Sequence, residues 1–474
     1  MIKKFINKLL QPLLAVKKEY IPIFTIYFFI GFNALAGVAF TIFYKDTINL
    51  SNADLTAVYI WAYLPWSIKM VFGSLIDGFK IFGNNRKSYI IFGQVLIFIG
   101  LCGLVDHAST QYIFNFIGQY AGLLLTSLVT QIGIVISDII ADTMAIEVVK
   151  KGPEREKELG KVQALIWIYR GLGAAIGAIV SGWLASILAI SQVFTLLLIA
   201  PIVIVVSTYF TKLTTKIKDT VLNKKILFTG TVYGVFCILS GLLFKDAQLI
   251  VFIVSFSVII LMLYSLLKSM PKKAKMTFVL SMSAIFLFRI IPHSGEAVNW
   301  FYMDVIGFDT YWLGIRNTLA TCSALFVLWF LMDYITGNNI FKTMLWLIVL
   351  MTLLSIPDIL IYYGIPQSMG IAAKGLALLD TALIAPLSAM AMIPLGVIIA
   401  NNAPEKERAI YIGLTASFMN VALLGGEVMS TYFQKIWIVT RGNYGQLGEL
   451  LIACLGISTI LSIIGLIILK RSKV

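Results

Sequence analysis

The chain has 474 residues, of which 59% are hydrophobic and only 13% are charged, and its mean hydropathy is +0.92. An ordinary soluble domain carries about a quarter charged residues, so this composition excludes a water-soluble fold and predicts an α-helical protein that crosses the membrane many times. The formal net charge is +14. Because the basic residues lie in alternate loops, this charge favours an orienting role at the membrane over nucleic-acid binding.

Six apolar runs, each long enough to cross a bilayer, fill the first part of the chain. They cover residues 20–44, 54–77, 87–106, 113–148, 160–189 and 191–211. A lysine-rich tail, residues 1–19, precedes the first run, which is too long for the apolar segment of a secretory signal peptide. We therefore expect a cytoplasmic tail followed by an N-terminal six-helix bundle over residues 20–211.

Two further apolar runs, 225–244 and 247–267, predict an extra transmembrane hairpin over residues 225–267. Six more runs predict a C-terminal six-helix bundle over residues 277–470, and they cover 277–304, 310–333, 340–363, 370–401, 407–433 and 447–470. Because the hairpin adds two crossings, both six-helix groups enter the membrane from the same side. Fourteen helices in this six, two, six arrangement predict an all-α membrane protein with the major-facilitator fold, built from two parallel repeats.

Lysine and arginine counts predict on which side of the membrane each loop lies. With the N-terminus in the cytoplasm, the inside segments hold 28 of the 37 basic residues, and the outside loops hold four: Lys45, Lys245, Lys435 and Arg441. The other five lie within predicted spans. This asymmetry predicts an integral, multi-pass membrane protein with both termini in the cytoplasm.

The sequence lacks the motifs of common nucleotide-dependent and catalytic sites. It contains no Walker A sequence, no HExxH and no GxSxG, which disfavours ATP-driven transport by this chain alone and disfavours an enzyme. Its four cysteines are far apart and lie in apolar runs, which argues against disulfides and a metal site. We expect no catalytic residues, no metal and no cofactor.

The loop between the second and third predicted spans has an acid at a helix end and basic residues after a glycine turn. Asp77 closes the second span, and Arg86 and Lys87 follow Gly83. This is the form of the facilitator loop motif that latches the cytoplasmic gate, and we assign Glu147, at the end of the fourth span, to the same gate. A capped helix end followed by an inside loop would give the same pattern, so the loop alone favours neither interpretation.

Motifs in four parts of the chain are similar to those of one transporter family. The second span and its turn contain Pro65, Trp66, Lys69, Gly73, Asp77, Gly83, Arg86 and Tyr89. The other matches are Asp142 and Glu147 in the fourth span, Pro292, Glu296, Phe301, Tyr302, Gly307, Phe308, Leu313 and Gly314 around the first span of the second group, and Ala403, Pro404, Glu407, Ala409, Leu414, Ser417, Asn420 and Glu427 near the tenth-to-eleventh junction. With departures at Met70, Ile76 and Asn84-Asn85, the set resembles the folate-biopterin transporter family of the major facilitator superfamily.

The resemblance covers roughly residues 55 to 435 without the hairpin. It implies a secondary transporter that works by alternating access, coupled to protons by symport or exchange, with folate or a pterin as the small organic anion carried. It also implies that the second, fifth, eighth and eleventh family helices form the interface between the two bundles. Two alternatives stay open on the same fold: a transporter of another solute, and a non-transporting assembly factor or receptor.

Ionisable side chains within predicted spans are costly, so each one needs a partner or a function. Consecutive helices run antiparallel, so residues at equal depth have a constant sum of residue numbers. This rule predicts three buried ion pairs: Asp138 with Arg170, Glu296 with Arg316, and Asp358 with Lys374. It leaves five charges without a partner at the same depth: Lys69, Arg289, Asp142, Asp380 and Glu427.

These charges predict a substrate site and a proton path. We expect basic side chains to bind the anionic group of the solute and aromatic ones to stack on a planar ring, and the candidates are Arg289, Lys69, Arg170, Arg316, Trp300 and Tyr302. We expect carboxylates that burial brings toward neutral titration to carry the proton, and the candidates are Asp142, Asp138, Glu296, Asp380 and Glu427. His293, one turn before Glu296, either joins this relay or packs at a helix kink.

Overall fold

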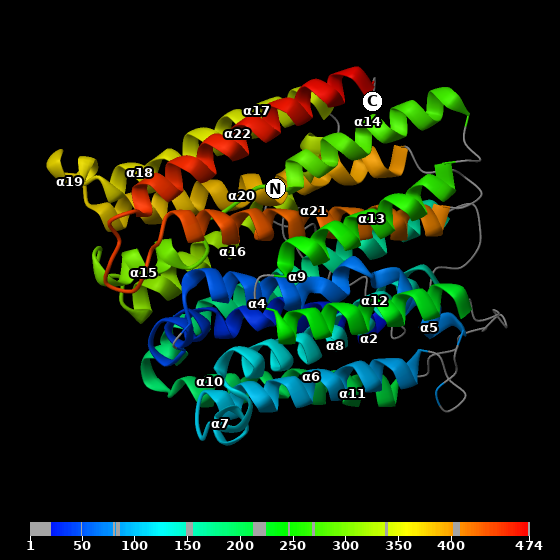
Figure 1. Ribbon diagram of the computed structural model, residues 1–474, viewed down its shortest axis with the longest axis horizontal. Coiled ribbons are helices and arrows are strands. Elements are labelled where there is room, and N and C mark those ends of the chain that lie inside the picture. Colours follow the sequence, from blue (N-terminus) through cyan, green and yellow to red (C-terminus); the bar gives the residue numbers. More distant parts are fainter. Residues whose placement is uncertain are drawn as a thin grey trace, which may run out of the picture.

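The computed structural model describes residues 20–48, 50–78, 81, 86–147, 155–211, 224–244, 247–267, 271–336, 340–401 and 408–472. This part of the chain is a bundle of long helices that run roughly side by side (Figure 1). Within it, eight helices are long and apolar enough to cross a membrane, judged by length and composition. The multi-pass helical architecture is therefore confirmed, and the count of fourteen crossings stays a prediction.

The first six predicted spans are each occupied by one helix or by a short series of helices. In chain order these are α2 (Ile21–Phe32), η2 (Asn33–Ala36), α3 (Gly37–Ile42), η3 (Phe43–Thr47), α4 (Asn52–Ser67), α5 (Lys69–Gly78), α6 (Lys87–His107), α7 (Tyr112–Ile117), α8 (Gln119–Glu147), α9 (Arg155–Ile187), α10 (Ile190–Leu197) and α11 (Ile199–Phe210). Pro65 lies inside α4, and the helix gives way to α5 at Ile68. The Asn420 side chain donates to the carbonyl of Trp66 at 2.9 Å, so a residue from the other bundle satisfies the main chain near this break.

Two helices of the predicted hairpin, α12 (Lys224–Leu243) and α13 (Gln248–Leu267), follow the first group. The second group consists of α14 (Lys272–Arg289), α15 (Ala297–Asp304), α16 (Thr310–Thr336), α17 (Ile340–Leu354), α18 (Ile356–Tyr362), α19 (Ile365–Ser368), α20 (Ala373–Asn401), α21 (Arg408–Ile436) and α22 (Leu447–Ser472). The hairpin packs on the line where the two groups meet, because α13 contacts α21 and α12 contacts both α4 and α5. The Tyr233 and Ser255 hydroxyls are hydrogen-bonded across it.

The span predicted as one helix over residues 277–304 is wrong in one respect, because it is broken. α14 ends at Arg289, residues 290–296 are not helical, and α15 begins at Ala297. Pro292 lacks an N–H and cannot continue the hydrogen-bond ladder, and Gly295 has φ +62°, a left-handed conformation that glycine adopts without strain. The break leaves main-chain N–H and C=O groups free to bond to other helices.

Two helix pairs hold the two groups together. α4 packs against α21, and α9 packs against α16. These are the second, eleventh, fifth and eighth family helices, the four that the sequence resemblance implied for the interface, and the structure adds how they pair. At the α9–α16 crossing the backbones nearly touch, since a Cβ on Gly182 would lie only 2.6 Å from the Cα of Gly314. Small residues permit this close approach of transmembrane helices.

Candidate functional site

A cavity of about 510 Å³ lies within the first helix group, which is in the usual size range of a small-molecule site. Its walls come from α2, α3, α4, α6, α8, α9, α10 and α11, and Glu296 of the broken segment also lines it. Six aromatic side chains face it: Phe29, Phe40, Tyr44, Tyr59, Tyr63 and Trp66. The cavity is therefore a largely aromatic and aliphatic space with a few polar groups.

One aromatic ring of this cavity is fixed in place by an amide. The indole N–H of Trp66 donates to the side-chain oxygen of Gln131 at 3.0 Å. Since the oxygen of Gln131 takes this bond, its NH₂ group is left as a donor beside the cavity. Tyr63, one turn earlier in α4, is 49% exposed and also lines the cavity.

Arg170 is the only cationic side chain among the described residues that line the cavity, and Glu296 is the only carboxylate among them. The Arg170 guanidinium lies 5.6 Å from the ring centroid of Trp167, where a cation–π contact holds it. The predicted pair with Asp138 is wrong, because Asp138 pairs with another cation. Within the described ranges no carboxylate lies within ion-pairing distance of Arg170.

Lys69 lies in a cluster of charged side chains in the first group. Its ammonium lies 2.6 Å from Asp138 Oδ2 and 2.9 Å from Asp142 Oδ2. Tyr27 completes the cluster by donating its hydroxyl to the other oxygen of Asp142 at 2.5 Å. The expectation that Lys69 and Asp142 lack partners is therefore wrong, because α5 packs on α8 although the two are not consecutive in sequence.

A second polar chain connects the broken segment with α16 and α20. Asn299 donates to Glu296 at 2.9 Å and accepts from Arg316 at 2.8 Å, and Arg316 also donates to Thr381 at 3.1 Å. The predicted Glu296–Arg316 pair is thus an indirect contact through an amide. Asp380, next to Thr381, is 7% exposed, and its Oδ1 has no hydrogen-bond partner within the described part of the chain.

The predicted pair of Asp358 and Lys374 is wrong. Asp358 accepts a hydrogen bond from the Tyr302 hydroxyl. Lys374 instead places its ammonium 5.6 Å from the ring centroid of Trp312 and 6.0 Å from that of Phe308. Aromatic faces attract cations by their quadrupole. These rings therefore stabilise the Lys374 ammonium, which the comparison of equal depths in consecutive helices had paired with the Asp358 carboxylate.

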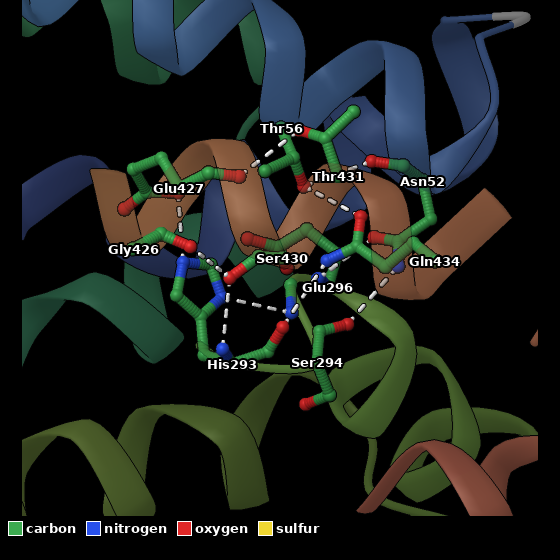
Figure 2. A network of polar contacts seen from close by, with 11 residues as sticks. Asn52, Thr56, His293, Ser294, Glu296, Gly426, Glu427, Ser430, Thr431 and Gln434 are labelled. Carbon is green, nitrogen blue, oxygen red and sulfur yellow. Dashed lines mark hydrogen bonds and ion pairs between the residues drawn. The ribbon is translucent and has the colours of Figure 1, made fainter. Parts of the chain in front are cut away.

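Figure 2 shows a network that joins the two helix groups at the broken segment. We call its members, Asn52, Thr56, His293, Glu427, Ser430 and Gln434, the interlobe latch. Asn52 of α4 donates to the Ser294 carbonyl and accepts from the Glu296 N–H, both at 3.0 Å. Gln434 of α21 accepts from Thr56 at 2.8 Å and donates to the His293 carbonyl at 3.3 Å.

His293 is the central residue of the latch. Its main-chain N–H donates to the Ser430 hydroxyl at 2.8 Å, and its ring Nδ1 accepts from the main-chain N–H of Gly295 at 3.0 Å. With Nδ1 acting as an acceptor, the ring proton belongs on Nε2, which lies 2.8 Å from Glu427 Oε2 and donates to it. Glu427, expected to be unmatched, therefore has a partner, and His293 belongs to a polar network as well as to a helix break.

Segments of the two groups also meet at one end of the bundle. We call the residues that meet there, 44–48, 50, 304 and 437–446, the sealed end. The guanidinium of Arg441 donates to the carbonyls of Tyr44 and Leu50. Asp304 lies 2.5 Å from the Lys45 ammonium and accepts from the Tyr444 hydroxyl. The contacts of Arg441 with Tyr44 and Leu50 and of Asp304 with Lys45 cross from the second group to the first.

Comparison with known proteins decides the family. The model of the BT1 family matches residues 30–474. The chain belongs to the BT1 family. The folate-biopterin transporter of Synechocystis sp. is 24% identical over 473 residues, covering 97% of this chain and 83% of that protein, and folate transporter 1 of Plasmodium falciparum is 21% identical over 429 residues, covering 90% and 74%.

Solved structures show the fold of this BT1-family chain. A peptide transporter of the POT family in complex with sulfate aligns with a TM-score of 0.69 at 15% identity, covering 96% of this chain and 94% of that one. A mutant form of the nucleoside transporter NupG aligns with a TM-score of 0.63 at 14% identity, covering 95% and 98%. The chain is a multi-pass membrane transporter with the major-facilitator fold.

Several predicted site residues of the BT1-family chain lie away from the cavity. Trp300 and Tyr302 are each 1% exposed, and cations already cover their rings: Arg441 at 5.1 Å from Trp300 and Arg316 at 4.9 Å from Tyr302. Neither ring is open to a substrate in this conformation. Arg289, half-buried at the end of α14, is not among the described lining residues.

The predicted gate is described only in part. Arg86 is buried just before α6, and Lys87 donates to the Tyr209 carbonyl at 2.7 Å. The side chains of Asp77 and Glu147 lie outside the described residues. Gln94, Gln131 and Asn52 were not among the site residues predicted from the sequence. For Gln94 and Gln131 the signal was an uncharged amide inside a predicted span, since polar groups there also need partners. Asn52 lies just before the predicted second span and had no such signal.

Proposed function

We propose that this protein is a proton-coupled transporter of a small organic anion of the folate or pterin class, and that it binds the anion in the cavity of the first helix group. The observation that carries the proposal is a cavity with six aromatic side chains and one cation. Planar aromatic rings provide large, stackable surfaces for a planar heterocycle, and an arginine provides a bidentate partner for a carboxylate. Relatives named as folate transporters support the same substrate class.

Arg170 is the residue that we assign to the carboxylate of the substrate. Lys69 is already engaged by two carboxylates, and Arg316 by Asn299 and Thr381. Arg170 lines the cavity, its guanidinium lies over the ring of Trp167, and no carboxylate of the described residues is within ion-pairing distance of it. Its donors are therefore available to an anionic ligand, and the assignment replaces the broader set of basic residues expected from sequence.

Glu296 is the residue that we assign to proton coupling, ahead of Asp138, Asp142, Asp380 and Glu427. Its carboxylate lines the cavity, and its main-chain N–H is held by Asn52 of the latch. A change of charge at this position would alter the electrostatic interaction with a bound anion and also the contact between the two helix groups. Coupling requires such a residue, because a ligand shifts a conformational equilibrium only through differential interactions with the two states.

The Lys and Arg counts predict which side of the membrane the sealed end faces. With both termini in the cytoplasm, the sealed end, which contains Lys45 and Arg441, faces outside. The latch and the sealed end then close the external route, and external substrate enters only after these contacts separate. We propose alternating access in which protonation of Glu296 favours that separation.

Uptake into proteoliposomes tests this function. Purified protein should accumulate radiolabelled folate when the outside is more acidic than the lumen, and a proton ionophore should abolish the accumulation. Unlabelled pterin should compete, whereas an unrelated dicarboxylate such as succinate should not. Accumulation that ignores the pH gradient would contradict proton coupling, and absence of folate uptake beside robust uptake of another solute would contradict the substrate class.

A further inference from the structure

One buried amide side chain that lines the cavity has no role in the function proposed above. Gln94 of α6 is 1% exposed and lines the cavity. Its NH₂ group donates to Ser137 of α8 at 2.8 Å. Its side-chain oxygen has no hydrogen-bond partner within the described part of the chain.

The orientation of this amide is set by its neighbour. The Ser137 hydroxyl donates its own proton to the Gly133 carbonyl at 2.9 Å, so it can only accept from Gln94. The NH₂ group of Gln94 must therefore point at Ser137, and the oxygen must point away from it. Because buried polar atoms are almost always hydrogen-bonded in native proteins, this oxygen marks a place for a donor that the described part of the chain does not provide.

The surroundings of Gln94 favour a flat and largely apolar occupant. Aliphatic side chains line the same part of the first group, among them Ile30, Ile97 and Ile134. Two threonines farther along α8, Thr126 and Thr130, also line the cavity, and each donates its hydroxyl to a carbonyl of its own helix. An occupant that fits here has apolar faces and at least one N–H or O–H in its plane.

We propose that Gln94 is a specificity-determining residue of the transport site, whose side-chain oxygen accepts a hydrogen bond from the amino group of a planar amino-heterocycle. The proposal rests on the function proposed above and places the two ends of the substrate. A pterin ring carries an exocyclic amino group beside a ring N–H, and this donor edge meets Gln94. The carboxylate end of the same molecule meets Arg170. Trp66, held by Gln131, contributes a ring face to the same cavity.

The test combines a change in the protein with a change in the ligand. Dissociation constants are measured by isothermal titration calorimetry on the purified full chain in detergent, with folate and with the folate analogue in which the 2-amino group is replaced by methyl. Gln94→Met should weaken folate binding roughly tenfold, because it removes one hydrogen bond and leaves a ligand donor unpaired. The same variant should change binding of the methyl analogue by less than about threefold. Gln367→Met is the matched control, since Gln367 lies in α19 away from the cavity, and it should leave both affinities unchanged.

Each outcome decides the proposal. Equal losses of affinity for both ligands would mean that Gln94 does not act on the amino group. No loss for either ligand would mean that the amide oxygen is satisfied in another way, for example by water. Either result would overturn the role of Gln94 while the proposed function stands. Failure of the wild-type protein to bind folate would overturn the substrate class and this inference together. If Gln94→Met does not fold, the ligand arm decides alone: wild-type protein must bind folate roughly tenfold more tightly than the methyl analogue, and equal affinities would overturn the proposal.

Discussion

At the scale of single residues, the cluster around Lys69 shows why charge alone does not reveal a substrate site. Lys69 is one of the residues whose surroundings resemble the family motif, and a cation inside a span suggests an anion site. Its ammonium is nevertheless shared by Asp138 and Asp142, and its side chain is 20% exposed. The cluster therefore fixes α5 against α8, and Arg170 is left as the cation of the cavity.

Replacing Lys69 tests this structural role. Lys69→Met leaves two carboxylates without their cation, one of them in a side chain that is only 9% exposed. Removing one partner of a buried pair costs about 3 kcal/mol, so the thermal unfolding temperature in detergent should fall clearly. The double variant Lys69→Met with Asp138→Asn should recover much of the loss, because the buried charge is then gone. A double variant as unstable as the single one would contradict this account.

The depth rule failed at this scale for a physical reason. It compares only helices that follow one another in the chain, whereas α5 reaches the acids of α8 and α21 reaches His293. Aromatic faces and amides also replaced predicted carboxylates, as Trp312 does for Lys374 and Asn299 does for Arg316. Which charges lie within spans could be predicted from sequence, and their partners could not.

At the scale of elements, the break between α14 and α15 is the most informative feature. It exposes the main chain of residues 290–296, and the latch residues of α4 and α21 bond to it. The helix ranges themselves agree closely with the apolar runs in the sequence. The break was missed because apolar segments lie on both sides of residues 290–296, and its signals in the sequence are Pro292 and Gly295.

Weakening the latch should open the sealed end. Gln434→Ala removes the bonds to Thr56 and to the His293 carbonyl, each worth about 1 kcal/mol, so the population of the opened state should rise roughly tenfold or more. The reporter is a single cysteine, Ser294→Cys, placed in a cysteine-free background. It should react faster with a membrane-impermeant maleimide when Gln434→Ala is added than when it is absent. Gln367→Ala serves as the control and should leave the rate unchanged. Equal rates in all three proteins would contradict the latch.

The crossing of α9 and α16 gives a second prediction for elements. A Cβ on Gly182 would lie 2.6 Å from Gly314 Cα and 2.7 Å from the Thr310 carbonyl oxygen. Gly182→Ala should therefore destabilise the protein by about 1–3 kcal/mol through overpacking. Gly456→Ala in α22, where a Cβ meets no atom within 4 Å, should be neutral or slightly stabilising. Thermal unfolding of both variants checks this, and equal effects would contradict close packing at the crossing.

At the scale of the whole molecule, composition and loop charge predicted most of the architecture. A chain whose regular apolar runs are bordered by lysines has few alternatives to a helical bundle in a membrane. The four helices of the interface followed from the resemblance, and their pairing did not. The cavity did not follow from either. Its walls are side chains of eight helices, most of them uncharged, and the order in which helices pack around a void depends on contacts that no local pattern records.

Folate binding by the Arg170→Met variant tests the central claim most directly, namely that an organic anion binds in the cavity of the first helix group. Loss of charge-assisted bonds to a carboxylate costs about 2 kcal/mol, so the dissociation constant should rise roughly thirtyfold. Arg471→Met, which removes a cation at the end of α22, should bind folate like the wild type. Unchanged affinity in Arg170→Met, with wild-type protein binding folate, would contradict the account.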